Sequence, residues 1–134
     1  QIVAEEYFNL QTEISEAVSV ENIKKQLAQG FLVLAPTAGR ELGNPNFKQP
    51  GPIYHFVVIR GYKGGKFIVN DVGTRKGEGY VYDFDVLINA VHDLAVVNGL
   101  PFRPYEETAL EDSVKQTNML TGVPRVLIVQ GILK

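Results

Sequence analysis

The chain contains no cysteine, and this absence excludes several classes of site. Disulfides and thiolate metal sites are impossible, and the two histidines, His55 and His92, are too few for a three-histidine zinc centre. We therefore expect no metal and no other cofactor. A thiol nucleophile cannot come from these 134 residues either.

Charge of one sign and long apolar runs are lacking as well. The formal net charge is -2, and the 13 Lys and Arg residues are scattered, so no basic surface is expected for a nucleic acid. No apolar run approaches the roughly 18 residues of a membrane span, and the N-terminus lacks a charged-then-apolar signal pattern. We expect a soluble chain with no nucleic-acid or membrane partner, and the composition points to no particular compartment.

The composition is that of one ordinary domain. A chain of 134 residues with 45% hydrophobic and 21% charged residues can bury a single core. We therefore expect one domain over residues 1–134, with a helix end and a short extended piece within residues 1–18.

The next elements have clearer signals. Ser19 is a good N-cap for an amphipathic helix, and Gly30 suits the position just after its end. The uninterrupted apolar run of residues 31–35 predicts a central buried strand. Residues 37–52 carry three glycines and three prolines, a composition and length typical of a lid or binding loop.

The C-terminal half has a weaker pattern of apolar residues. Residues 80–82 begin as strand, and Asp83 can cap a helix that runs to Ala95 and is closed by Asn98 and Gly99. Residues 110–120 predict one or two helical turns, and residues 125–133 predict a final strand.

His55 and Asp71 lie at the two far ends of a predicted hairpin, residues 53–74. A histidine can take a proton from a nucleophile and return it to a leaving group, and an acceptor on its second nitrogen fixes its tautomer and orientation. Asp71 is the candidate acceptor. From the hairpin alone, however, a structural histidine and a turn-opening aspartate are the commoner explanation.

The catalytic interpretation depends on the register of this hairpin, because side chains alternate between the two faces of a strand. A two-residue turn at Gly64 and Gly65 pairs Val58 with Asp71 and places His55 and Asp71 on opposite faces. A five-residue loop over residues 62–66 instead pairs Val57 with Asp71, which makes His55 and Asp71 diagonal neighbours on one face.

Three further polar residues are candidates for contact with a substrate. Asn44 and Gln49 in the long loop could donate hydrogen bonds to a substrate backbone, although anchoring of the loop is the commoner role. Asn70 points to the opposite face from Asp71 in a regular strand, so a contact with a neighbouring loop is the alternative.

From residue 19 to residue 94 the chain resembles the C39-like family of papain-fold cysteine peptidases. The resemblance lies in an ordered set of motifs: IKKQLAQG, FLVLAPTAGR, LGNPNF, PGPIYHFVVIRGY, FIVNDVGTRKG and YVYDFDVLINAVHD. It implies an α+β, papain-like fold, in which an antiparallel sheet or half-barrel lobe is flanked by helices. It also matches His55 to the family's catalytic histidine and Asp71 to its orienting acid, while Val72 stands where the family more often has proline.

The family's nucleophilic cysteine and its preceding glutamine cannot be placed in this chain. The resemblance therefore implies the C-terminal, His- and Asp-bearing lobe of a cysteine peptidase, N-terminally incomplete, with cysteine supplied by a missing segment or by another chain. Two alternatives stay open: a nucleophile-less pseudoenzyme that binds a peptide or protein, and a transglutaminase-like acyl transferase. In each case the implied partner is a peptide or protein, and this chain alone is expected to be inactive.

Overall fold

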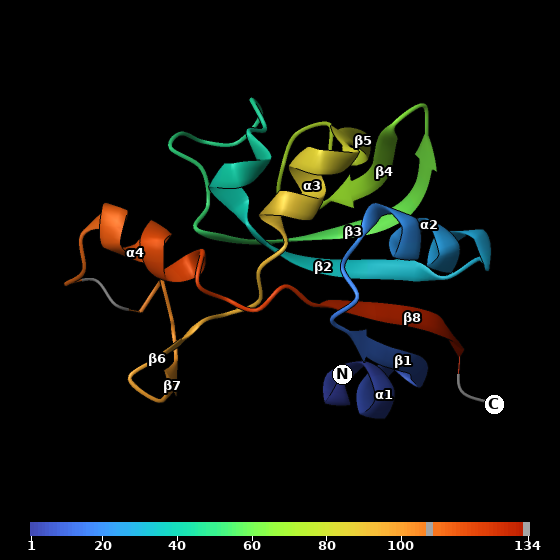
Figure 1. The fold of residues 1–134 in the computed structure, drawn as a ribbon, viewed down its shortest axis with the longest axis horizontal. Helices are drawn as coiled ribbons and strands as arrows, with labels where there is room; N and C mark the ends of the chain where they lie inside the picture. The colour runs from blue at the N-terminus through green and yellow to red at the C-terminus, as the bar shows by residue number, and fades with distance from the viewer. Residues whose placement is uncertain (107–108, 133–134) are drawn as a thin grey trace.

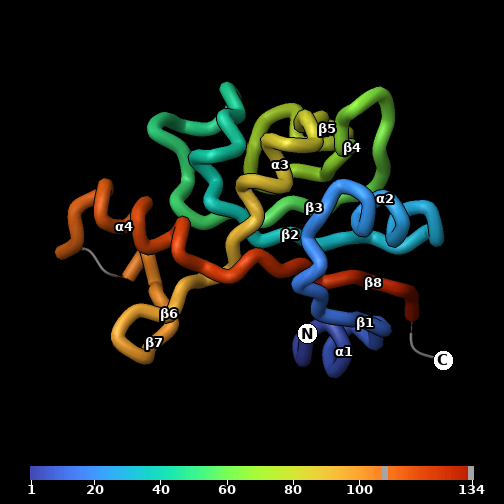
Figure 2. The backbone as a smooth tube through the Cα atoms, viewed as in Figure 1, coloured from blue at the N-terminus to red at the C-terminus, as the bar shows by residue number. Residues whose placement is uncertain are grey.

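A six-stranded antiparallel sheet organises the molecule, in the order β1-β8-β2-β3-β4-β5 (Figure 1). The computed structural model describes residues 1–106 and 109–132. The strands are β1 (Leu10–Ser15), β2 (Leu32–Ala38), β3 (Tyr54–Lys63), β4 (Lys66–Asp71), β5 (Glu78–Asp83) and β8 (Val126–Ile132). Strands β1 and β8 come from opposite ends of the chain and lie side by side (Figure 2).

The helices within the described ranges are short. They are α1 (Ile2–Phe8), α2 (Val20–Ala28), the 3-10 helix η1 (Gly39–Leu42), α3 (Phe84–Ala90) and α4 (Asp112–Met119). The predicted cap of α2 is confirmed, because the Ser19 hydroxyl accepts a hydrogen bond from the Asn22 N–H at 3.1 Å. None of the helices in the described part is long and apolar enough to cross a membrane.

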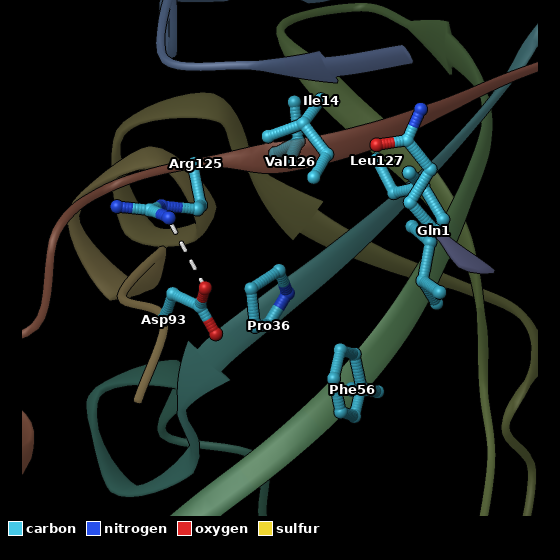
Figure 3. Close-up of a pocket in the computed structure, with 9 residues that line it drawn as sticks. Gln1, Ile14, Pro36, Phe56, Asp93, Arg125, Val126 and Leu127 are labelled. Atoms are coloured by element: carbon cyan, nitrogen blue, oxygen red, sulfur yellow. Dashed lines mark ion pairs between the residues drawn. The ribbon is translucent and has the colours of Figure 1, made fainter. Parts of the chain in front are cut away.

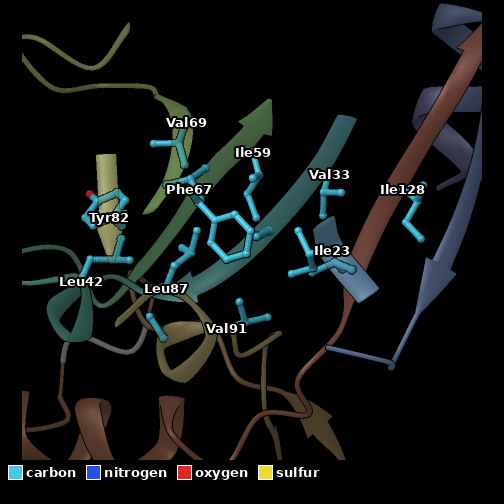
Figure 4. Close-up of a cluster of buried hydrophobic side chains, with 14 of the residues drawn as sticks. Ile23, Val33, Leu42, Ile59, Phe67, Val69, Tyr82, Leu87, Val91 and Ile128 are labelled. Atoms are coloured by element: carbon cyan, nitrogen blue, oxygen red, sulfur yellow. The ribbon is translucent and has the colours of Figure 1, made fainter. Parts of the chain in front are cut away.

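The main core lies between α2, α3 and one face of the sheet (Figure 4). Ile23 of α2 and Leu87 of α3 are buried in the same cluster as β-strand residues that alternate along the sheet. Each fully buried aliphatic side chain of this kind contributes about 1.5–3 kcal/mol relative to an exposed one. The strand members of the cluster are Val33, Ala35, Val57, Ile59, Phe67, Val69, Tyr82, Val126 and Ile128.

The long loop after β2 is shorter than the sequence predicts. Strand β2 continues to Ala38, so Thr37 belongs to the sheet, and η1 follows it directly. Thr37 pairs with His55 across the ladder, and its hydroxyl donates to the His55 carbonyl oxygen at 2.7 Å. The strand extension therefore holds the backbone at His55.

The predicted length of the second long helix is wrong. Helix α3 ends at Ala90, because the chain then turns to β2, where the His92 N–H donates to the Pro36 carbonyl oxygen at 3.1 Å. Asn98 and Gly99 do not close a helix. Both have positive φ and form the turn between two short strands, β6 (Val96–Val97) and β7 (Leu100–Pro101), as an Asn-Gly pair favours.

A second apolar cluster holds the C-terminal segment against the end of the sheet. Phe102 and Met119 are fully buried there with Ala38 and Ile53. In Figure 1, α4 and the β6–β7 hairpin lie at the left, at the opposite end of the molecule from α2. This cluster brings residues that follow α3 next to the start of β3.

The β3–β4 register combines features of both sequence alternatives. The turn is the tight one, Gly64 and Gly65, with both residues at positive φ and Lys63 paired with Lys66. Val57 nevertheless pairs with Asp71, because the register shifts between Ile59 and Gly61. Arg60 is thus the extra residue of a β-bulge, and it restores the pairing that the five-residue loop would have given.

Deletion of Arg60 tests this explanation of the register. Without the extra residue, the ladder from the Gly64–Gly65 turn becomes regular, and Ile59 and Val57 keep their pairing with Val69 and Asp71. We expect the free energy of unfolding to change by less than about 1 kcal/mol, since no buried side chain changes face. Denaturant unfolding measures this change.

The matched control is Arg60→Ala, which keeps the chain length and the bulge. Because Arg60 is exposed, its truncation is expected to change stability by less than about 1 kcal/mol. A deletion variant that loses more than about 3 kcal/mol, as expected if two buried aliphatic side chains turned to solvent, would show that Arg60 is not the extra residue.

Candidate functional site

His55 and Asp71 meet on the core-facing side of the sheet, at the ends of β3 and β4. The His55 Nε2 atom lies 2.5 Å from Asp71 Oδ1. The Asp71 side chain has no exposed surface, whereas 13% of the His55 side chain is exposed. Burial of a carboxylate costs free energy unless the group is paired and hydrogen-bonded. The contact with His55 therefore offsets part of the cost of burying Asp71.

The second Asp71 oxygen is held by two residues from other segments. Oδ2 accepts a hydrogen bond from the Tyr82 hydroxyl at 2.5 Å and a longer one from Asn44 Nδ2 at 3.4 Å. The same Asn44 amide donates to the Tyr82 hydroxyl oxygen at 2.9 Å. Burial and the hydrogen bond to Asp71 raise the pKa of Tyr82 above its ordinary value, so the phenol remains a donor.

The position of the His55 ring is constrained from two further sides. The Phe47 ring packs edge-on against it with a centroid distance of 4.9 Å. Gly39 of η1 approaches so closely that a Cβ there would lie 2.9 Å from His55 Cβ and 2.6 Å from the Pro52 carbonyl oxygen. Only glycine fits at this position without a shift of the backbone.

His55 lines an open pocket of about 430 Å³. Its Nδ1 atom makes no hydrogen bond to any residue of the described ranges. The other residues around the pocket are Asn46, Phe47, Lys48, Gly51, Pro52, Val72, Gly73, Thr74 and Tyr105. The arrangement leaves one nitrogen of a carboxylate-oriented imidazole available beside an accessible space.

The three predicted substrate-contacting residues lie in different surroundings. Asn44 is 2% exposed, and its side-chain oxygen, Oδ1, accepts from the Asn46 N–H at 2.8 Å, so both ends of its side-chain amide are used inside the protein. Asn70 faces away from Asp71, and its Oδ1 accepts from the Gly79 N–H at 3.3 Å. Gln49 is exposed in the loop and does not line the His55 pocket.

Sequence reasoning missed Tyr82 and Tyr105. Tyr82 lies two residues after Tyr80 on the same face of β5 and pairs with Phe67, so the direction of this face could be deduced only once the β4–β5 register was known. Tyr105 lies 51 residues from Tyr54, yet its hydroxyl donates to the Tyr54 carbonyl oxygen at 2.8 Å and accepts from the Tyr54 N–H at 3.3 Å. No local pattern indicates a contact at that separation.

A second pocket, of about 200 Å³, lies on the opposite face of the sheet (Figure 3). Leu34, Pro36 and Phe56 contribute to its apolar wall. At one end, Arg125 Nε lies 3.6 Å from Asp93 Oδ2. His55 and Asp71 do not line this pocket. In the described ranges, no group of three or more His, Asp or Glu side chains is arranged to hold a metal ion.

The two histidines are predicted to carry their protons on opposite ring nitrogens. A carboxylate and a carbonyl oxygen only accept hydrogen bonds, so His55 is protonated at Nε2 toward Asp71. His92 is protonated at Nδ1 toward the Gly122 carbonyl oxygen, 2.9 Å away. Long-range proton-nitrogen NMR at a pH where both rings are neutral measures the tautomers, and a neutral His55 protonated at Nδ1 would contradict the arrangement.

The buried Tyr82 phenol predicts a loss of stability in alkali. An unfolded tyrosine releases its proton near pH 10, but folded Tyr82 retains it because burial and Asp71 raise its pKa. The unfolded state is therefore favoured as the pH rises above about 10. Urea unfolding at about pH 8 and about pH 11 should show a smaller loss in Tyr82→Phe than in the unaltered chain; an equal loss would count against this role of the phenol.

Comparison with known proteins shows to which family the chain belongs. One solved structure, a Bacillus anthracis protein named as a C39-like peptidase, is 13% identical with a TM-score of 0.49; the match covers 97% of the present chain and 56% of that protein's chain. No curated protein matches the chain. The model of the Peptidase_C39 like family matches residues 1–93. Because this match spans more than half of the 134 residues, the chain belongs to the Peptidase_C39 like family.

Proposed function

We propose that this chain supplies the general base, His55, and its orienting acid, Asp71, to the active site of a cysteine peptidase with a papain-like fold. The cysteine would come from residues outside this sequence or from another chain. The observation that carries the proposal is the 2.5 Å contact between His55 Nε2 and Asp71 Oδ1 beside an open pocket. Membership of the Peptidase_C39 like family supports the same assignment.

The proposed chemistry uses the two nitrogens of His55 for different tasks. Asp71 accepts the Nε2 proton, which leaves the Nδ1 lone pair free to take a proton from a cysteine thiol. The thiolate attacks the peptide carbonyl carbon, and the protonated His55 returns the proton to the leaving amine as the C–N bond breaks. A water molecule, deprotonated by His55, then hydrolyses the thioester and releases the acid and the thiol.

Burial gives Asp71 its role in this cycle. When Nδ1 takes the thiol proton, the imidazolium carries a full positive charge beside the Asp71 carboxylate. The attraction is strong because the Asp71 side chain is shielded from water. Asp71 therefore stabilises the charged intermediate in addition to fixing the orientation of the ring.

The pocket beside His55 is the proposed site for the peptide substrate. Its loop walls, residues 46–48 and 72–74, carry one charged side chain, Lys48, which suits recognition of a peptide main chain more than of a charged ligand. Gln49 lies in the loop that forms one wall and remains a proposed substrate contact. Asn44 and Asn70 are committed to neighbours within the fold, so we do not propose that they touch the substrate.

The absence of cysteine from the chain favours one second candidate, a module that binds a peptide without cutting it. The same pocket would then hold the peptide, and His55 and Asp71 would be structural or binding residues. Acyl transfer to an amine in place of water would use the same residues as the peptidase reaction and differs only in the acceptor.

The test compares the 134 residues alone with the complete polypeptide encoded by the gene, or with the complex if a second chain completes the site. We expect no peptide hydrolysis by the isolated chain, and hydrolysis that iodoacetamide abolishes in the complete protein. His55→Ala should lower kcat by at least about 10²–10⁴-fold, the usual contribution of a general base. Peptide cleavage measured by mass spectrometry is the readout, with an added amine to detect acyl transfer.

His92→Ala is the matched control, because His92 hydrogen-bonds Gly122 and does not line the pocket; its kcat is expected to stay unchanged. Turnover by the isolated chain that His55→Ala abolishes would contradict the need for an external cysteine. Peptide binding without cleavage by the complete protein would favour the binding module.

A further inference from the structure

We propose that Tyr82 is a positioning residue for the His55–Asp71 pair and that Asn44 assists it. This inference rests on the proposed function, because it assigns these two residues to the same site. Tyr82 would act through Asp71 and would not touch the substrate. Its task is to hold one carboxylate oxygen so that the other faces His55 Nε2.

The need for such a residue follows from the geometry of a carboxylate. The last side-chain torsion of an aspartate has a broad energy profile, so one hydrogen bond does not fix the plane of the carboxylate. In Asp71 the two oxygens have separate tasks: Oδ1 contacts His55, and Oδ2 receives the Tyr82 hydroxyl and the Asn44 amide. Rotation of the group would break contacts at both ends.

Tyr82 is suited to this task by its protonation. Its hydroxyl donates to Asp71 Oδ2, and the hydroxyl oxygen accepts from Asn44 Nδ2. A phenolate in the same place would repel the carboxylate, but burial and Asp71 raise the pKa of Tyr82 above its ordinary value. The phenol therefore remains a donor at any pH at which a peptidase of this kind would work.

Asn44 fixes the direction of the Tyr82 hydroxyl. The Asn44 side-chain oxygen, Oδ1, accepts a hydrogen bond from the Asn46 N–H at 2.8 Å, which turns the amide Nδ2 toward Tyr82 and Asp71. The four residues of this chain of contacts come from three separate parts of the sequence: the loop after β2, the β3–β4 hairpin, and β5. The arrangement restrains the hairpin ends where His55 and Asp71 meet.

The alternative is that Tyr82 only fills the core. Tyr82 is 4% exposed, belongs to the main apolar cluster and packs edge-on against Tyr80 at a centroid distance of 4.9 Å. Removal of its hydroxyl would then alter stability without altering the His55 proton. The test must therefore read the His55 ring directly.

The experiment measures solvent exchange of the His55 Nε2 proton by NMR in the 134-residue chain, which needs no nucleophile. In Tyr82→Phe we expect exchange about tenfold faster than in the unaltered chain, the factor set by loss of one hydrogen bond to a charged group. Asp71→Ala removes the acceptor and so gives the exchange rate of a His55 proton without its hydrogen bond. The rate in Tyr82→Phe should lie between that value and the rate in the unaltered chain.

Tyr80→Phe is the matched control. Tyr80 lies on the same strand and packs against Tyr82, but its hydroxyl is not a donor to Asp71. We expect it to leave the exchange of the His55 proton unchanged. The amide protons of Ile59 and Val69, which pair across the same ladder, report general opening of the sheet and should exchange at the same rate in both variants.

Equal His55 exchange in Tyr82→Phe and Tyr80→Phe would overturn the proposal, and so would a rise in exchange that Ile59 and Val69 share. If Tyr82→Phe does not fold, Asn44→Ala decides, with a smaller increase expected and no increase counting against the proposal. The result is separate from the peptidase assay. A complete protein that cuts no peptide contradicts the proposed function, whereas the exchange measurement still shows whether Tyr82 positions Asp71.

Discussion

The candidate site depends on the burial of one carboxylate, that of Asp71. A charged group without exposed surface needs several donors, and within the described ranges it has three: His55, Tyr82 and Asn44. Each comes from a different segment of the chain. Satisfying Asp71 therefore fixes the relative positions of the loop after β2, the β3–β4 hairpin and β5, and it places the imidazole beside the pocket.

The sheet makes that meeting possible through a single extra residue. The tight Gly64–Gly65 turn by itself would leave His55 and Asp71 on opposite faces, and the bulge at Arg60 corrects this by one position. The same correction keeps Val57 and Ile59 in the core, with Ile59 opposite Val69. Packing and site geometry thus impose the same register, because both require the same face of β3 to point inward.

The C-terminal third contributes to the site from outside the matched family region. Phe102 and Met119 anchor this segment in the second cluster, and Tyr105 reaches back to both backbone polar groups of Tyr54, the residue before His55. Arg40 of η1 is tied to Asp112 of α4 at 2.6 Å. Tyr105, which lines the His55 pocket, therefore lies after the family match, which ends at residue 93.

The sequence by itself determined the elements with local signals: the Ser19 cap of α2, the alternation along β3 and β4, and His55 and Asp71 as the pair to examine. Those signals act over a few residues, through side-chain periodicity and turn chemistry. The sequence did not decide the register of the hairpin, and it led to the wrong prediction that Asn98 and Gly99 close a helix. Tertiary structure decided both, since the bulge at Arg60 is set by burial of β3 against its neighbours. It also decided the partners of Asp71, because Asn44 and Tyr82 reach it only once three segments pack together.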